Sequence, residues 1–188
     1  MSKRNSKKKT NEPKTSDSTY KALVREKRTV GRPKSKVARK NVYVELSPEQ
    51  KALLKTLSAE ISPNLIRADI PDLAVAILSS KFDALRKATT GRTREIPQGI
   101  TDLGSLYLLW DLPLPDDSQL KWTTVRLSPQ QAVEFGRIHG TLRALYGSTK
   151  SQVFDLALSL LTRFAKENKL TDIEAESVDT VRAKIKNN

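Results

Sequence analysis

The residues best suited to chemistry in this chain are basic, and most of their excess charge lies in one segment. Residues 1–40 contain 15 Lys and Arg against the three acids Glu12, Asp17 and Glu26, a balance of +12. Residues 41–188 contain the other 19 basic residues against 18 acids, a balance of +1. A polycation of this kind neutralises phosphate groups and releases their counterions. The alternative is a solubilising tail attached to a nearly neutral folded part.

The groups that catalysis and metal binding require are missing from the sequence. It has no Cys, and its one His, His139, has no second His or Cys with which to hold a metal ion. It contains no Gly-rich phosphate loop, no Ser/His/Asp set and no paired catalytic carboxylates, and Asp116 and Asp117 stand in a predicted turn. We therefore predict that the protein is not an enzyme and uses neither a metal nor another cofactor.

The hydropathy pattern gives no indication of a membrane protein. No apolar run approaches the roughly 20 residues that cross a bilayer, and no apolar stretch follows the basic N-terminus as in a secretory signal. The lack of Cys also excludes a disulfide framework. We expect a cytoplasmic protein.

One sequence pattern, V-x-L-S-P-x-Q, occurs twice, at 44–50 and at 125–131, 81 residues apart. In both copies a short alternating run leads into Ser-Pro, and a helical pattern follows. A lone strand leaves its backbone donors and acceptors without partners, so the two strands are expected to pair with each other. Internal repetition of this kind fixes an architecture.

The alternating runs divide into an apolar and a polar face. In the first copy Val42, Val44 and Leu46 share one face, and in the second Thr123, Val125 and Leu127 do so. The opposite faces carry Asn41, Tyr43, Glu45, Trp122, Thr124 and Arg126.

Cap residues predict where the helices begin and end. Ser47 and Ser128 are expected at the N-caps of the first helix of each copy, and Pro63 is expected to end the earlier of these two helices. Asp69 and Thr149 are the predicted caps of the second helices. The apolar positions expected to face the core in the helix after Ser128 are Val133, Phe135, Ile138, Leu142 and Leu145.

Five segments follow from these patterns. The stretch 106–110 between the copies is apolar enough to pack on the core, so a docked connector is expected there, and the last segment carries an amphipathic helical pattern. The predicted segments are a basic disordered arm 1–40, a first copy 41–88, a connector 89–120, a second copy 121–168 and a C-terminal helix 169–188.

The order strand, Ser-Pro, helix, polar turn, helix resembles the ribbon-helix-helix (Arc/MetJ-like) DNA-binding family. The second copy is the closer match, in 123–129 and in the turn 147–151, Gly-Ser-Thr-Lys-Ser. The first copy departs at its turn, where Asp69-Ile70-Pro71 replaces the usual Gly and Ser/Thr residues. The resemblance implies a mainly α fold with a short two-stranded antiparallel ribbon. Here two tandem ribbon-helix-helix copies in one chain would form a pseudo-dimer.

The resemblance also implies that the ribbon enters the major groove of double-stranded DNA and that its outward side chains contact base edges. Arg126 then suits guanine, Asn41 adenine, Glu45 the cytosine amino group and Thr124 a thymine methyl group. Tyr43 and Trp122 are large for the floor of a groove, so we expect them at the ribbon ends.

Phosphate contacts are expected outside the ribbon. In the family the N-terminus of the second helix grips phosphate, which Thr149, Lys150 and Ser151 suit, with Lys121 nearby. Asp69 and Pro71 do not suit it, so the predicted clamp is lopsided. Gly31-Arg32-Pro33-Lys34 resembles an AT-hook core, so a minor-groove contact is predicted for Arg28, Arg32 and Lys34, with an ordinary basic linker as the alternative.

These features predict a sequence-specific DNA-binding protein, nucleoid- or plasmid-associated, that acts in transcriptional repression or in plasmid maintenance or partition. Self-association along DNA is compatible with this interpretation. The alternatives are a relaxosome-type DNA-processing accessory protein and an antitoxin-like interaction module that binds a protein partner through 169–188. RNA binding is disfavoured, because a ribbon does not fit the deep, narrow major groove of an A-form helix.

Overall fold

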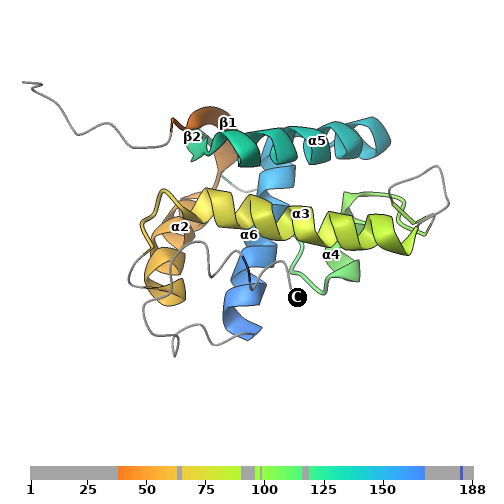
Figure 1. Ribbon diagram of the computed structural model, residues 1–188, viewed down its shortest axis with the longest axis horizontal. Coiled ribbons are helices and arrows are strands. Elements are labelled where there is room, and N and C mark those ends of the chain that lie inside the picture. The colour runs from red at the N-terminus through yellow and green to blue at the C-terminus, as the bar shows by residue number, and fades with distance from the viewer. Residues whose placement is uncertain are drawn as a thin grey trace, which may run out of the picture. The chain divides into compact units, whose positions relative to one another are not determined.

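The computed structural model describes residues 38–62, 65–89, 96–97, 99–115, 119–167 and 183. Within them the chain is mainly helical with one two-stranded antiparallel sheet, which confirms the predicted fold class at this level. The elements in chain order are β1 (Lys40–Leu46), α2 (Pro48–Ile61), α3 (Ile70–Ala88), α4 (Leu103–Leu109), β2 (Lys121–Leu127), α5 (Pro129–Tyr146) and α6 (Lys150–Glu167) (Figure 1).

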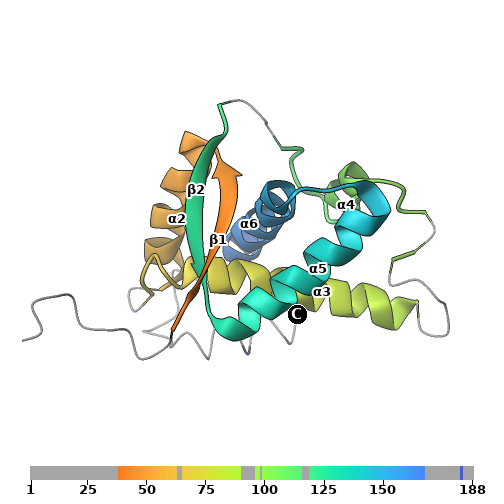
Figure 2. The same ribbon diagram turned by 90° about the horizontal axis from the view of Figure 1, so that it is seen from above.

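The two repeated strands pair with each other, as the sequence predicts. Figure 2 shows β1 and β2 side by side, and their antiparallel register runs from Lys40 opposite Leu127 to Leu46 opposite Lys121. The predicted inner face is also confirmed. It packs on the core through Val44, Leu46, Val125 and Leu127, each at most 4% exposed.

The helices begin at the predicted cap residues, but the caps differ in kind. Ser47 forms a full capping box with Gln50, whose backbone N–H donates to the Ser47 hydroxyl over 3.1 Å. Thr149 and Gln152 exchange the same two bonds at the start of α6. Ser128 and Asp69 stand at their predicted N-cap positions without a side-chain cap bond.

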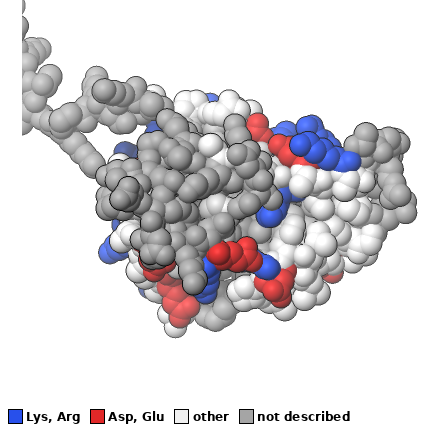
Figure 3. All heavy atoms as spheres, turned by 60° about the horizontal axis from the view of Figure 1, so that its bottom comes forward, with Lys and Arg blue, Asp and Glu red and all other residues white. Residues whose placement is uncertain are grey.

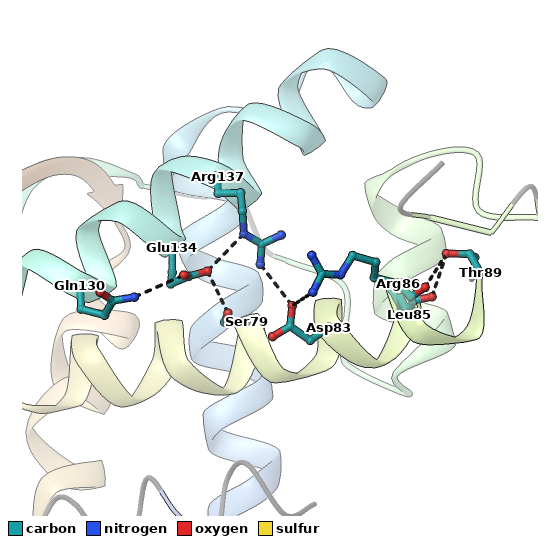
Figure 4. A network of polar contacts seen from close by, with 8 residues as sticks. All are labelled: Ser79, Asp83, Leu85, Arg86, Thr89, Gln130, Glu134 and Arg137. Carbon is teal, nitrogen blue, oxygen red and sulfur yellow. Dashed lines mark hydrogen bonds and ion pairs between the residues drawn. The ribbon is translucent and has the colours of Figure 1, made fainter. Parts of the chain in front are cut away.

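The helices of the two copies interleave beneath the ribbon. α3 packs against α5 and α6, and α2 packs against α6 (Figure 1). A chain of polar contacts joins α3 to α5 across their exposed sides (Figure 4). In it Glu134 accepts from the Ser79 hydroxyl at 3.2 Å and pairs with Arg137, which reaches Asp83 at 3.5 Å. One core is therefore built from both copies.

The connector between the copies docks on this core, as predicted, through Leu106 and Tyr107, both fully buried. The structure adds a short helix, α4, whose N-cap Asp102 accepts from the Ser105 N–H at 2.6 Å. The buried Tyr107 hydroxyl donates to Asp155 of α6 over 2.5 Å. That hydrogen bond removes the cost of burying an unpaired hydroxyl and fixes the connector to the second copy.

Two predicted core positions of α5 are wrong. Val133 is 62% exposed and Leu145 is 49% exposed, whereas Phe135, Ile138 and Leu142 are buried. The three buried residues follow the i, i+3, i+7 spacing of one helix face. Val133 lies two residues before Phe135, which places it on the opposite side of the helix.

The described surface carries charges of both signs. On the face seen in Figure 3, Lys and Arg side chains lie beside Asp and Glu side chains among uncharged ones. Among the described helices, none is long and apolar enough to cross a membrane. The predicted arm, with Arg28, Arg32 and Lys34, lies outside the described residues, as does the predicted C-terminal helix apart from residue 183.

Gly147 and Gly140 offer a matched test of the turn between α5 and α6. Gly147 adopts φ 69°, and a Cβ there would meet no atom within 4 Å, so Gly147→Ala costs only the left-handed backbone penalty. We expect the free energy of unfolding in urea to fall by about 1 kcal/mol. Gly140→Ala, in the open middle of α5, should instead raise it by about 0.5–1 kcal/mol. Equal effects would contradict this account of the turn.

Candidate nucleic-acid interface

The outer face of the ribbon carries six side chains turned away from the core. Glu45 is half-buried and the other five are exposed, with Tyr43 64% and Trp122 71% exposed. The structure thus brings together on one face the residues that the sequence predicts there: Asn41, Tyr43, Glu45, Trp122, Thr124 and Arg126. Large apolar rings this exposed are typical of a surface that contacts another molecule.

The strand register decides which of these side chains are neighbours. Asn41 lies opposite Arg126 at one end of the ribbon, which we call the Arg126 end. Glu45 lies opposite Trp122 at the other, which we call the Trp122 end. Directly opposite residues on one face have Cβ atoms about 4.5–5.5 Å apart. One end therefore presents an amide beside a guanidinium, and the other a carboxylate beside an indole.

The middle of the ribbon differs from the sequence-based expectation. Tyr43 lies opposite Thr124, at the centre of both seven-residue strands, so its predicted place at a ribbon end is wrong. Trp122 does lie near an end, as the second residue of β2. The difference arises because the position of a residue along the ribbon depends on the register, which only the pairing of the two strands fixes.

The N-terminus of α6 lies at the Trp122 end. The Ser151 hydroxyl, in a residue only 8% exposed, accepts from the backbone N–H of Glu45 at 2.8 Å. Ser151 thereby ties the start of α6 to β1. Lys150 is exposed, and among the described residues none accepts from the backbone N–H groups of Lys150 or Ser151. Free amides and the helix dipole together favour an anion at this point.

Lys121 is exposed at the same end of the ribbon, where it lies opposite Leu46 in the register. Its carbonyl accepts from the Lys51 ammonium group at 3.4 Å. Two lysines therefore lie close to the start of β2, where the sequence predicts one.

The N-terminus of α3 lies at the Arg126 end and carries a different set of groups. Asp72, 2% exposed, accepts from the backbone N–H of Ser128, the residue that follows β2, at 2.8 Å. Arg39 donates to Asp69 at 2.6 Å, approaches Asp72 at 3.6 Å and also donates to the carbonyl of Ala68. Pro71 provides no backbone N–H. This helix start is occupied by carboxylates of the chain itself.

Sequence reasoning missed Arg39 and Asp72 as members of this interface. Arg39 is assigned by sequence to the basic arm, yet its guanidinium is bound 30 residues away along the chain, at Asp69. A contact of that separation leaves no periodic or motif signal. The only indication in the sequence is the pair of acids within the first turn of a predicted helix, at Asp69 and Asp72.

His139 lies on α5, stacked on Phe135 with ring centroids 6.4 Å apart. Burial lowers the pKa of His139 below 6.5, and the positive charges of Lys150 and Arg143 lower it further. The folded protein thus holds this imidazole neutral, while the unfolded chain protonates it near pH 6.5.

Because the pKa of His139 is lower in the folded state, the unfolded state gains a proton first as the pH falls. We expect the free energy of unfolding to decrease from pH 7.5 to pH values below 6.5 and to level off once the folded form also protonates. His139→Gln should remove this component in urea titrations across that range. An unchanged pH dependence in the variant would show that His139 does not cause it.

No family model, curated protein or solved structure matches this chain. The function of the molecule is therefore inferred from its ribbon, its two helix N-termini and its distribution of charge.

Proposed function

We propose that this protein binds double-stranded DNA sequence-specifically by inserting the ribbon of β1 and β2 in the major groove. The observation that carries the proposal is the outer ribbon face, which aligns hydrogen-bonding and apolar side chains in three facing pairs. A two-stranded ribbon fits the major groove, which presents a distinct pattern of donors and acceptors for every base pair. The membership in the ribbon-helix-helix family is part of the same proposal.

The register supports a pseudo-dimer built from one chain. Tyr43 and Thr124, which occupy equivalent positions 81 residues apart, lie opposite each other. Asn41 faces Arg126, the equivalent of position 45, and Glu45 faces Trp122, the equivalent of position 41. Strands related by a two-fold axis through the central pair have this reciprocal arrangement. The interleaved packing of α2 and α3 with α5 and α6 points the same way.

The two ends of the ribbon favour different bases. At the Arg126 end, a guanidinium donates to guanine O6 and N7, and the Asn41 amide forms two bonds with adenine. At the Trp122 end, the Glu45 carboxylate accepts from a cytosine amino group, while Trp122 supplies an apolar surface. In the centre Thr124 contacts a thymine methyl group. The preferred DNA site is therefore asymmetric, with purines of one strand under the Arg126 end.

Phosphate contacts position the ribbon without adding specificity. The start of α6 provides them at the Trp122 end through Thr149, Lys150 and the free amides of its first turn, with Lys121 beside it. Ser151 takes part through its backbone N–H, since its hydroxyl is bound to Glu45. The basic residues before the ribbon add affinity that depends on salt. A protein of this kind acts by occupying a DNA site, as transcriptional repressors and plasmid maintenance or partition factors do.

The proposal is tested by selecting bound fragments from random duplex DNA with the full-length chain. We expect one enriched, non-palindromic motif. Enrichment of nothing beyond base composition, with equal affinity for every duplex, would contradict sequence-specific binding. Preferential capture of RNA hairpins over duplex DNA in the same assay would contradict major-groove insertion, because A-form RNA closes that groove to a ribbon.

Arg126→Ala should weaken binding to the selected duplex by about 1–3 kcal/mol and relax discrimination at one base pair. The reason is the loss of two hydrogen bonds to a single base. Arg86→Ala is the matched control, since it removes an equally exposed guanidinium near the C-terminal end of α3 and should leave affinity unchanged. Fluorescence anisotropy with the selected and single-substitution duplexes measures both. Equal affinities of Arg126→Ala and the unmodified protein for all duplexes would remove Arg126 from the set of base-contacting residues.

Lys150→Gln should weaken binding to every duplex alike and reduce the slope of log affinity against log salt by about 0.9, the contribution of one neutralised phosphate. Lys166→Gln removes an exposed lysine from the last turn of the same helix and should leave the slope unchanged. A change of base preference in Lys150→Gln, at a constant slope, would contradict the assigned phosphate contact.

A further inference from the structure

The two ends of the ribbon differ in what they offer to a DNA backbone. At the Trp122 end, the start of α6 has free amides and the exposed Lys150. At the Arg126 end, the start of α3 has Pro71 in its first turn and the carboxylates of Asp69 and Asp72, which repel phosphate. The second helix of the first copy therefore cannot make the backbone contact that the second helix of the other copy makes.

Arg39 fixes where the basic segment joins the folded part of the chain. Its guanidinium, with only 19% of the side chain exposed, is bound by Asp69, Asp72 and the carbonyl of Ala68. Arg39 directly precedes β1, whose first residue Lys40 lies opposite Leu127. The residues before Arg39 are thus tethered at the Arg126 end, beside the helix start that lacks a phosphate contact.

The sequence next to this tether is strongly basic. Residues 27–38 contain five Lys and Arg, Lys27, Arg28, Arg32, Lys34 and Lys36, and no Asp or Glu. A flexible segment of this length extends on the order of 20 Å from its attachment point. That is about the length of a seven-residue strand at roughly 3.4 Å per residue. Its effective concentration is consequently higher on the near flank of a bound site than on the far one.

We propose that residues 27–38 bind the DNA backbone on one flank only, beyond the Arg126 end of the ribbon, where they replace the phosphate contact that α3 cannot make. This inference rests on the proposed function and specifies it further. The protein then holds its DNA site by two unlike devices, the start of α6 on one flank and the basic segment on the other. Arg39 acts as a positioning residue that directs the segment to its flank.

The absence of Cys from the chain allows a direct test, because a single introduced thiol can carry an iron chelate that cleaves nearby DNA. Three variants of the full chain are compared on the duplex selected from random DNA. Glu49→Cys and Gln130→Cys mark the two ends, since they occupy equivalent positions in the first turns of α2 and α5, directly after β1 and β2. Ser35→Cys reports the basic segment.

We expect Gln130→Cys and Glu49→Cys to cleave opposite flanks of the motif, and Ser35→Cys to cleave only the flank that Gln130→Cys cleaves. Arg39→Ala combined with Ser35→Cys should spread the cuts to both flanks. If the two markers cleave opposite flanks while Ser35→Cys, with Arg39 intact, cleaves both or only the Glu49 flank, the inference fails and the proposed function stands. If the markers give no position-defined cuts, or no motif is selected, the proposed function fails and the inference with it.

Discussion

The pairing of β1 with β2 is the constraint on which the rest of the structure depends. Each strand alone would leave a row of backbone donors and acceptors unpaired, and within this chain the only repeat of the pattern lies 81 residues away. A slip of one residue would turn Val44 and Leu46 to solvent, so the register is set by the core. The same register selects the outward side chains and places the starts of α3 and α6 at opposite ends of the ribbon.

The second feature of the molecule is the divergence of its two copies on a shared plan. Position 45 carries an acid where position 126 carries Arg, and α3 begins with Asp69 and Pro71 where α6 begins with Thr149 and Ser151. A homodimer repeats every contact on both sides of its axis, whereas two copies in one chain are free to differ. In the account proposed above, this freedom produces an asymmetric DNA site and two different backbone contacts.

Much of the local structure follows from the sequence. The strands, their two faces, the cap positions Ser47, Ser128 and Thr149 and the docked connector are set by neighbouring residues, and all are present. Contacts between distant segments leave no local pattern, so the bonds of Arg39 to Asp69 and of Glu45 to Ser151 were not predictable. The central place of Tyr43 depends on the register in the same way. The predicted base and phosphate contacts stay predictions, since they concern a second molecule.

The central claim is that a single chain contains the complete DNA-binding ribbon. Native mass spectrometry of the full chain, mixed at low concentration with the selected duplex trimmed to its motif, tests this most directly. The account predicts a complex of one 21.0 kDa chain with one duplex, and a free protein of the same single-chain mass. A smallest complex that always holds two chains, with no one-chain species at any concentration, would contradict it.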